Sequence, residues 1–377
     1  MHKYSVAVAG ATGYAGGEAL RILAAHPYCD VTCVAGHTSV GHVMGEFAPH
    51  IPQYASLEVQ DTTPDVLSGH DVVILALPHG ASGKIASELH DVKVVVDLGA
   101  DHRLEHKNDW DAFYGGDFYD HWTYGMPELV LGDRRKTSRE KSDADYRFQR
   151  ENLHGATHIA GPGCNVTATT LALQPAIAAG LVEKNVTAAL AVGYSGAGKS
   201  LGKVNLLAAQ ALGSAQAYSV GGRHRHIPEI KQNFAHAAGL TDDNGLSAHY
   251  ETSQIKLGFT PVLVPMSRGI MATVSAPLSH KALEMSDAKI REIYLDVYAQ
   301  QDFMILLPEG VLPATADVIG SNAAHIQVVV DRNAGLLYGF CAIDNLNRGT
   351  AGQAIQSLNI ALGLPEDAGL TKIGVAP

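Results

Sequence analysis

The fold of the first part of this chain follows from the stretch Val6-Ala7-Val8-Ala9-Gly10-Ala11-Thr12-Gly13-Tyr14-Ala15-Gly16-Gly17. An apolar run leads directly into a glycine-rich turn of the form G-x-x-G-x-x-G, and a helical pattern follows it. Glycines in such a turn let the backbone approach a pyrophosphate closely, and the N-terminus of the next helix contributes its dipole. The turn predicts a dinucleotide site, whose expected contacts are Gly10, Thr12, Gly13, Tyr14, Ala15 and Gly16.

Short apolar runs alternate with helical patterns over the first hundred residues. The runs 4–9, 31–35, 72–77 and 92–98 are typical of buried strands, and segments between them, such as 18–25, have helical spacing. This alternation predicts a Rossmann-type, doubly wound α/β domain with a parallel sheet.

The pattern changes after Cys164. Long strand-like runs alternate there with helical segments, which predicts an α+β domain with a largely antiparallel sheet. The expected strands are 187–192, 257–264, 269–276, 326–330 and 337–343, and the expected helices are 203–212, 286–299 and a last one from Ala351 to Leu362. The predicted domains are 1–163 for the dinucleotide, 164–344 for catalysis and oligomerisation, and 345–377 for a helix returning to the first domain. A charged insert at 133–151 is interpreted as a surface excursion.

Composition excludes several classes of protein. The 377 residues are 46% hydrophobic and 17% charged, as expected for a soluble globular chain of two domains. A net charge of −11 argues against a nucleic-acid partner, and no long apolar span or signal peptide indicates a membrane or export. The 19 histidines show no metal-ligand spacing, so we expect no metal. Four dispersed cysteines favour a reducing compartment, and we expect the cytoplasm.

The second predicted strand bears on the choice of dinucleotide. It ends in Ala35-Gly36-His37-Thr38-Ser39, without the carboxylate that binds the ribose 2′-hydroxyl in NAD sites. Hydroxyls at Thr38 and Ser39 could accept a 2′-phosphate, so we expect NADP; the alternative is that both are ordinary turn residues. Leu77, Pro78 and His79 end another strand at the same edge and are expected to border the nicotinamide.

A second motif predicts a nucleophile. Gly161-Pro162-Gly163-Cys164-Asn165 places one cysteine after a tight turn and at the start of a helical pattern. A helix N-terminus favours the thiolate, and its free N–H groups could hold an oxyanion. We expect the Asn165 N–H to be the oxyanion donor; the alternative is a buried structural cysteine.

Six strings stand out across the chain: 100–104, 124–129, 161–164, 195–198, 224–230 and 344–352. Together they resemble the N-acetyl-γ-glutamyl-phosphate reductase family, which is related to aspartate-semialdehyde dehydrogenase. The resemblance implies NADPH-dependent reduction of an acyl phosphate to an aldehyde by a homotetramer, a dimer of dimers, in arginine biosynthesis. Asn165 stands where the family commonly has an aromatic residue, and the related branch that acts on carrier-bound aminoadipyl phosphate often shows Cys-Asn, which leaves that substrate open. Aspartyl phosphate is a further alternative with the same chemistry. The alternative outside the enzymes is a non-catalytic sensor protein that binds NADP.

The expected chemistry passes through a thioester. Cys164 attacks the acyl carbon, phosphate leaves, and hydride from NADPH reduces the thioester. His226 is the first candidate for acid–base work and His224 the second, because imidazole titrates near neutral pH; both could instead be structural. Since residues i and i+2 point to opposite sides of an extended segment, only one of them is expected to face Cys164.

The remaining candidates bind the anionic substrate or the cofactor. Arg103 and Arg268 match phosphate and carboxylate groups, with structural ion pairs as the alternative. The turn Ser195-Gly196-Ala197-Gly198-Lys199 could form an anion-binding nest that serves both ligands, or could be a packing turn. The resemblance also places Tyr218 near the site and Asn345 at the nicotinamide, with a helix cap as the alternative for Asn345. Asn165 is an expected substrate contact by its place at the start of the helix.

Overall fold

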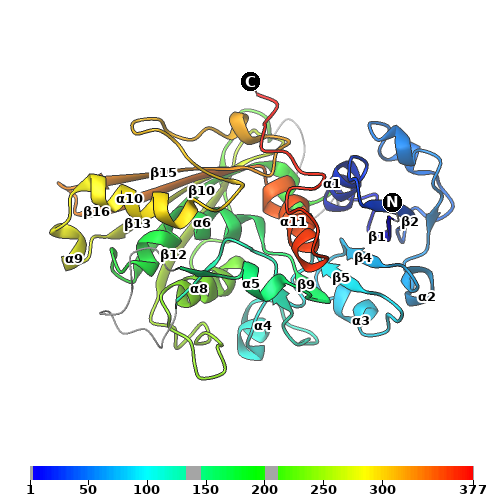
Figure 1. Ribbon diagram of the computed structural model, residues 1–377, viewed down its shortest axis with the longest axis horizontal. Coiled ribbons are helices and arrows are strands. Elements are labelled where there is room, and N and C mark those ends of the chain that lie inside the picture. The colour runs from blue at the N-terminus through cyan, green and yellow to red at the C-terminus, as the bar shows by residue number, and fades with distance from the viewer. Residues whose placement is uncertain (1–2, 133–145, 200–210, 377) are drawn as a thin grey trace.

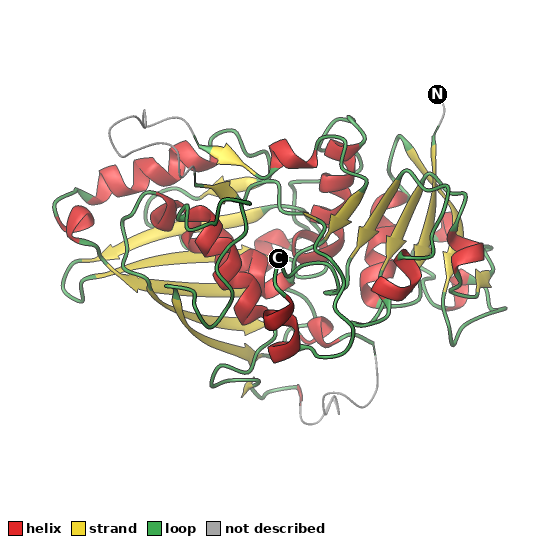
Figure 2. Cartoon of the chain, turned by 90° about the horizontal axis from the view of Figure 1, so that it is seen from below, coloured by secondary structure: helices red, strands yellow, loops and turns green. Residues whose placement is uncertain are grey.

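The computed structural model describes residues 3–132, 146–199 and 211–376, and these form two lobes built on two seven-stranded sheets (Figure 1). Helices lie between and around the two sets of strands (Figure 2). Helix α11 (Gly352–Ala361) lies where the lobes meet (Figure 1). In the described part of the chain, no helix is long and apolar enough to cross a membrane.

The first sheet confirms the predicted doubly wound α/β fold. Its strand order is β3-β2-β1-β4-β5-β9-β6, and every neighbouring pair is parallel. The central strands are fully buried apolar runs, as expected when helices cover both faces. The strands are β1 (Tyr4–Ala9), β2 (Cys29–Ala35), β3 (Val59–Gln60), β4 (Val72–Leu75), β5 (Val94–Asp97), β6 (Thr123–Tyr124) and β9 (His158–Ala160); the helices include α1 (Tyr14–Leu23), α2 (Pro64–Leu67), α3 (Ser82–Ala86) and α4 (Lys107–Phe113).

The second sheet is mixed, with four antiparallel and two parallel neighbouring pairs in the order β11-β12-β10-β13-β16-β15-β14. The largely antiparallel sheet expected from the sequence is therefore confirmed. Its strands are β10 (Asn185–Val192), β11 (Gln216–Ala217), β12 (Lys256–Leu263), β13 (Ile270–Pro277), β14 (Met304–Leu306), β15 (Ala324–Asp331) and β16 (Leu336–Ile343).

One face of this second sheet is covered by α6 (Cys164–Ala178), which carries Cys164 at its first position. The approach is close: a Cβ on Gly339 of β16 would lie 2.0 Å from the carbonyl oxygen of Ala172. The hydroxyl of Tyr294, on α10 (Asp287–Tyr298), donates to the same carbonyl at 3.1 Å. Helix α8 (His226–Ala237) packs against α6 and β12, and α10 packs against α6, β14 and β15. The short helix α9 (His280–Leu283) lies between β13 and α10 along the chain. The sheet therefore fixes the start of α6 at the junction of the lobes.

The end of the chain returns to the first sheet. A π-helical turn, η5 (Asn347–Ala351), leads into α11. Ile355 and Leu358 of α11 share one hydrophobic core with Val6 and Val96 of the central strands. This return brings the segment before α11 close to both the glycine turn and α6.

Two sequence expectations remain, the charged insert at 133–151 and the helix at 203–212. Residues 133–145 of the predicted insert and most of the predicted helix 203–212 lie outside the described residues. The described end of the predicted insert, 146–151, has exposed side chains at Arg147 and Glu151 and carries regular structure. Arg147–Phe148 form β8, which pairs with β7 (Val130–Leu131), and α5 (Arg150–Leu153) follows. Phe148 packs against the core, which holds this end in place.

Candidate active site

Cys164 is the first residue of α6, directly after the turn that follows β9. The N-cap is Gly163, which has no side chain to bond the free N–H groups, and the first turn contains no acidic residue. The backbone N–H groups of Cys164 and Asn165 face the sulfur and act to lower the pKa of the thiol. The predicted placement of a cysteine at an uncapped helix N-terminus is confirmed.

The helix N-terminus favours the thiolate, but it is not the largest influence on the pKa of this thiol. Burial is the largest influence on Cys164 and raises its pKa to about 11, against the lowering by the two N–H groups and by Arg103. The negative charge of Glu229 raises the pKa further. The sulfur is therefore a thiol at neutral pH in this structure, and a nucleophilic attack needs a base beside it.

His226 is the candidate for that base, because it lies against the residue before Cys164. It begins α8, and its ring lies against Gly163: a Cβ on that glycine would be 2.6 Å from Nε2 of the imidazole. Burial is the main reason that its pKa lies well below the usual range, and the charges of His224, Arg103 and His79 add to the lowering. The ring is thus neutral, and the lowered pKa makes it a weaker base than a free imidazole.

His224 lies beside His226, which corrects the expectation that the two rings point apart. The segment is not extended there, because Arg225 adopts helical dihedral angles before α8 begins. Nδ1 of His224 accepts the backbone N–H of His226 at 3.1 Å, and the two ring centroids are 4.8 Å apart. Burial, followed by the charge of Arg225, lowers the pKa of His224 to about 4. His224 therefore supports the start of α8 and the ring beside it.

The structure also brings Tyr218, which the resemblance placed near the site, next to His224 and Asn165. The Tyr218 ring centroid is 5.5 Å from that of His224. The Asn165 amide nitrogen donates to the Tyr218 hydroxyl oxygen at 3.4 Å, and the buried amide oxygen of Asn165 has no partner among the described residues. Two polar side chains thus face each other next to Cys164.

The cysteine turn is held by a buried residue that sequence reasoning missed. One carboxylate oxygen of Glu229, which has no exposed surface, accepts the N–H of Gly163 at 3.0 Å and the hydroxyl of Tyr124 at 2.8 Å. Glu229 follows His226 by three residues on α8, so both face the same side of the helix. That spacing is the signal that could have identified it.

Arg103 is buried beside the other end of the turn. Its Nε donates to the carbonyl of Gly161 at 2.6 Å and one terminal nitrogen donates to the carbonyl of Leu98 at 2.8 Å. The other terminal nitrogen lies 3.6 Å from Glu229. All three guanidinium nitrogens thus face protein oxygens, and this geometry favours the structural ion pair over the predicted substrate contact.

The glycine turn between β1 and α1 has the shape that a dinucleotide needs. Gly10 has a φ of +73°, and a Cβ there would lie 2.2 Å from the carbonyl oxygen of Ala76. A Cβ on Gly16 would lie 2.2 Å from the carbonyl oxygen of Gly10. Helix α1 begins at Tyr14 without a side-chain cap or an acid in its first turn. Its free N–H groups therefore fit a pyrophosphate.

A cavity of about 660 Å³ opens beside this turn. Segments from both lobes line it, including Thr12, Gly13, Tyr14, Phe47, Ser195, Gly198, Lys199 and Arg268. Ser39 approaches the turn from the end of β2, with its hydroxyl oxygen 3.3 Å from that of Thr12, whereas Thr38 is exposed. Leu77, Pro78 and His79 directly follow Ala76, the neighbour of Gly10, so the structure places them at the same edge.

Asn345 contacts Ser195, which lines this cavity. Its amide nitrogen lies 3.0 Å from the hydroxyl oxygen of Ser195, which lies in η3 (Tyr194–Ala197), and its amide oxygen accepts the N–H of Gly269 at 2.8 Å. A Cβ on Gly196 would lie 3.8 Å from the same amide nitrogen. The alternative that Asn345 caps a helix is wrong, because η5 begins at Asn347 after Leu346.

Arg268 lines the dinucleotide cavity, and its charged contacts are carboxylates of the protein. Its guanidinium lies 2.8 Å from Glu18 on α1 and 2.9 Å from Asp344. Both carboxylates are buried. The structural ion pair is again favoured over the predicted substrate contact, and it links the two lobes beside the cavity.

Two family models cover most of the chain. Residues 5–136 match the NAD binding domain of semialdehyde dehydrogenase, and residues 164–345 match the semialdehyde dehydrogenase dimerisation domain. Among curated proteins, the N-acetyl-gamma-glutamyl-phosphate reductase of Bifidobacterium longum (strain DJO10A) is 68% identical over 378 residues and covers 100% of both chains. The protein of that name from Leifsonia xyli subsp. xyli is 49% identical over 99% of both chains.

Solved structures share the fold at low identity. Aspartate semialdehyde dehydrogenase II from Vibrio cholerae, complexed with ASA, has a TM-score of 0.65 and 15% identity over 96% of this chain and 99% of its own. Aspartate semialdehyde dehydrogenase with NADP from Candida albicans has a TM-score of 0.65 and 13% identity over the same shares. At these identities the likeness concerns the fold alone.

Proposed function

This chain belongs to the N-acetyl-gamma-glutamyl-phosphate reductase family of semialdehyde dehydrogenases, and we propose that it reduces N-acetyl-γ-glutamyl phosphate to N-acetyl-L-glutamate 5-semialdehyde and phosphate with NADPH. The observation that carries the mechanism is the contact of the neutral His226 ring with Gly163, the residue before Cys164. Full-length identity to reductases of this name favours the acetylated substrate over aspartyl phosphate and carrier-bound aminoadipyl phosphate.

His226 makes the first step possible. It takes the proton of the Cys164 thiol, whose pKa of about 11 leaves little thiolate at neutral pH. The thiolate attacks the acyl carbon, a C–S bond forms, and the bond from that carbon to the phosphate oxygen breaks. Phosphate leaves with the bonding electrons, and an acyl thioester remains on Cys164.

The backbone N–H groups at the start of α6 serve the second half of the reaction, the reduction of the thioester. When bound, NADPH supplies the hydride that reduces the thioester carbonyl. The N–H groups at the start of α6 stabilise the oxyanion that develops on the acyl oxygen, and they lower the pKa of the departing Cys164 thiolate. The C–S bond then breaks, the aldehyde is released, and the imidazolium of His226 returns its proton to the sulfur.

The residues that would hold NADPH are those of the glycine turn and the segments around it. The free N–H groups at the start of α1 would bind the pyrophosphate, and Ser195 and Asn345 would border the nicotinamide. NADP is favoured over NAD because the end of β2 brings the hydroxyl of Ser39, and no carboxylate, next to Thr12. Tyr218 and Asn165, next to Cys164, would contact the substrate.

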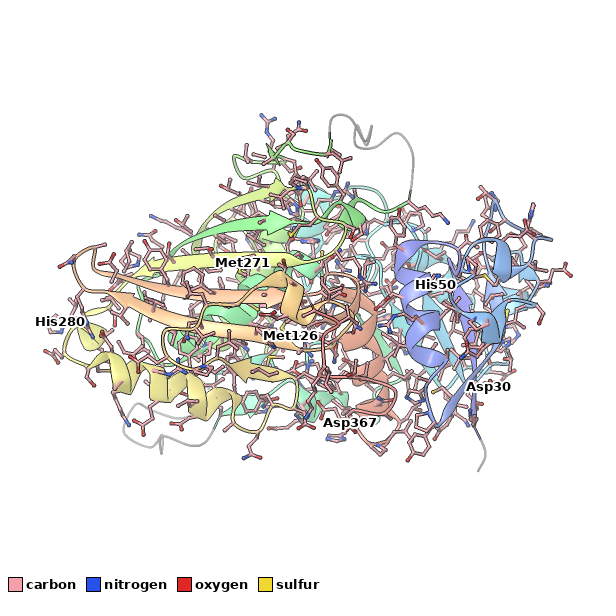
Figure 3. The ribbon with its side chains drawn as sticks, turned by 90° about the horizontal axis from the view of Figure 1, so that it is seen from above. Asp30, His50, Met126, Met271, His280 and Asp367 are labelled. Carbon is pink, nitrogen blue, oxygen red and sulfur yellow. The ribbon has the colours of Figure 1, made fainter. Side chains whose placement is uncertain are left out.

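The chain is proposed to act as a homo-oligomer that pairs through the open face of the second sheet. Cross-strand neighbours on that face include Ala189, Thr273 and Phe340 in one row and Met271 in the next, opposite to the face that α6 covers. Figure 3 shows these strands in front of the helices, with Met271 labelled on them. The match to a dimerisation domain supports a second copy as the occupant. The proposed assembly is a dimer of dimers. The proposed location is the cytoplasm, because all four cysteines are free thiols, as a reducing compartment requires.

The activity is tested in the reverse direction with purified protein. We expect phosphate-dependent reduction of NADP with N-acetylglutamate semialdehyde and none with aspartate semialdehyde. Cys164→Ala should retain NADP binding and lose turnover. Activity with aspartate semialdehyde alone would contradict the proposed substrate. Light scattering of the wild type and of Phe340→Asp tests the oligomer, because a charge on the open face should dissociate it.

A further inference from the structure

Lys199 reaches from the second lobe to the glycine turn of the first. It follows Gly198, whose φ of +79° belongs to the left-handed region, and its ammonium nitrogen lies 3.3 Å from the carbonyl oxygen of Thr12. The same ammonium lies over the ring of Phe47, 5.6 Å from the centroid. Two residues of the first lobe thus fix a side chain that comes from 187 positions further along the chain.

The charge of Lys199 is available to a ligand, unlike that of Arg268 in the same cavity. Arg268 is paired with the carboxylates of Glu18 and Asp344. Within the ranges 3–132, 146–199 and 211–376, Lys199 makes no ion pair with a carboxylate, and its one hydrogen bond goes to a backbone carbonyl. An ammonium has three donors, so two remain free for an anion.

The position of Thr12 indicates which anion is bound. Its carbonyl meets Lys199, while its hydroxyl oxygen lies 3.3 Å from that of Ser39 at the end of β2. Ser39 in turn packs against Gly36, where a Cβ would lie 2.7 Å from its hydroxyl oxygen. In this fold the end of the second strand contacts the ribose next to the adenine, and a carboxylate there would repel a phosphate on that ribose.

We propose that Lys199 binds the 2′-phosphate of NADP and so sets the preference for NADP over NAD. The inference rests on the proposed function, because it concerns the cofactor of that reaction. An ammonium–phosphate contact is charge-assisted and outweighs a neutral hydrogen bond. The pyrophosphate is served by the backbone N–H groups at the start of α1, so binding of NAD does not depend on Lys199.

The test is a calorimetric titration with two pairs of probes. Adenosine 2′,5′-bisphosphate and AMP differ only in the 2′-phosphate, as do NADP and NAD. We expect Lys199→Gln to weaken the first member of each pair about tenfold and to change the second less than about twofold. Lys199→Arg keeps the charge and should retain most of the preference.

Lys281 provides the matched control. It is an exposed lysine whose ammonium also donates to a backbone carbonyl, that of Ala179 at 2.9 Å, far from the glycine turn in the sequence. Lys281→Gln should leave all four affinities unchanged, and circular dichroism checks that each variant is folded.

The outcomes separate this inference from the function on which it rests. Equal weakening of both members of each pair would overturn the inference, because Lys199 would then serve the pyrophosphate. An unchanged preference in Lys199→Gln, with a wild type that favours NADP, would overturn the inference and leave the function standing. A wild type that binds neither dinucleotide would contradict both.

Discussion

The imidazole of His226 lies against Gly163, so closely that a Cβ on this glycine would be 2.6 Å from Nε2 of the ring. The residue before the nucleophile is a glycine because the base occupies the space of its side chain. The same residue donates its N–H to Glu229 at 3.0 Å. Nucleophile, base and the carboxylate that holds the turn are therefore linked through one residue without a side chain.

Gly163→Ala should displace the His226 ring and lower kcat about a hundredfold, since small misplacements of catalytic groups carry costs of this size. NADP binding should be unchanged, because the glycine turn of α1 lies elsewhere. Steady-state kinetics and a cofactor titration measure the two quantities. A variant with wild-type kcat would show that the ring position is not needed for turnover.

Alkylation of Cys164 should become faster as pH rises. Burial raises the pKa of this thiol to about 11, so the thiolate fraction, and with it the rate, should increase about tenfold per pH unit from neutrality. Glu229→Gln removes a charge that raises this pKa, and its profile should shift to lower pH. Iodoacetamide labelling followed by mass spectrometry of the Cys164 peptide gives both profiles. A rate already constant at pH 7 would contradict the buried thiol.

Arg268→Met should destabilise the junction of the lobes. The change leaves Asp344 buried without a counter-charge, for which about 3 kcal/mol is typical, and leaves Glu18 with Arg21 as its remaining partner. Glu18→Gln in the same background should then cost less than it does alone. Urea unfolding of the four proteins of this cycle measures the coupling. Additive effects would mean that the Arg268–Glu18 contact contributes nothing.

Acid should lower the free energy of unfolding, because His224 is buried in its neutral form. Burial lowers its folded pKa to about 4 from 6.5, so the unfolded chain binds a proton that the folded chain does not. This contribution to stability is present above about pH 6.5 and is lost as pH falls toward 4, by about 2 kcal/mol at pH 4.5. His224→Asn should lose less stability than the wild type between pH 7 and pH 4.5 in urea titrations. Equal losses in the two proteins would contradict the assignment.

The local features of the site could be predicted from the sequence. The glycine turn and the cysteine after Gly-Pro-Gly depend on a few adjacent residues, so their places at the starts of α1 and α6 follow from turn and helix rules. The turn at Arg225, which brings both histidine rings together, leaves no such pattern, and an extended segment was expected there. The division into domains at residues 163 and 344 stays a prediction.

The supporting charges could not be predicted in the same way. Glu229 and Tyr124 meet across 105 positions, and only the packing of β6 against α8 shows that they share a bond. Arginine side chains such as Arg103 and Arg268 suit substrate anions. Their N–H groups, however, already contact carboxylate and carbonyl oxygens of the protein that lie far away in the sequence. Short strands such as β9, of three residues, are also too brief to give a period.

The thioester on Cys164 is the central claim, and phosphate release without cofactor tests it most directly. Enzyme mixed with N-acetyl-γ-glutamyl phosphate in the absence of NADPH should release one phosphate per active subunit in a burst, and the Cys164 peptide should carry the acyl group in mass spectrometry. Cys164→Ala should give no burst above the spontaneous hydrolysis of the substrate. Phosphate release that waits for NADPH, or a burst of equal size in Cys164→Ala, would contradict the covalent mechanism.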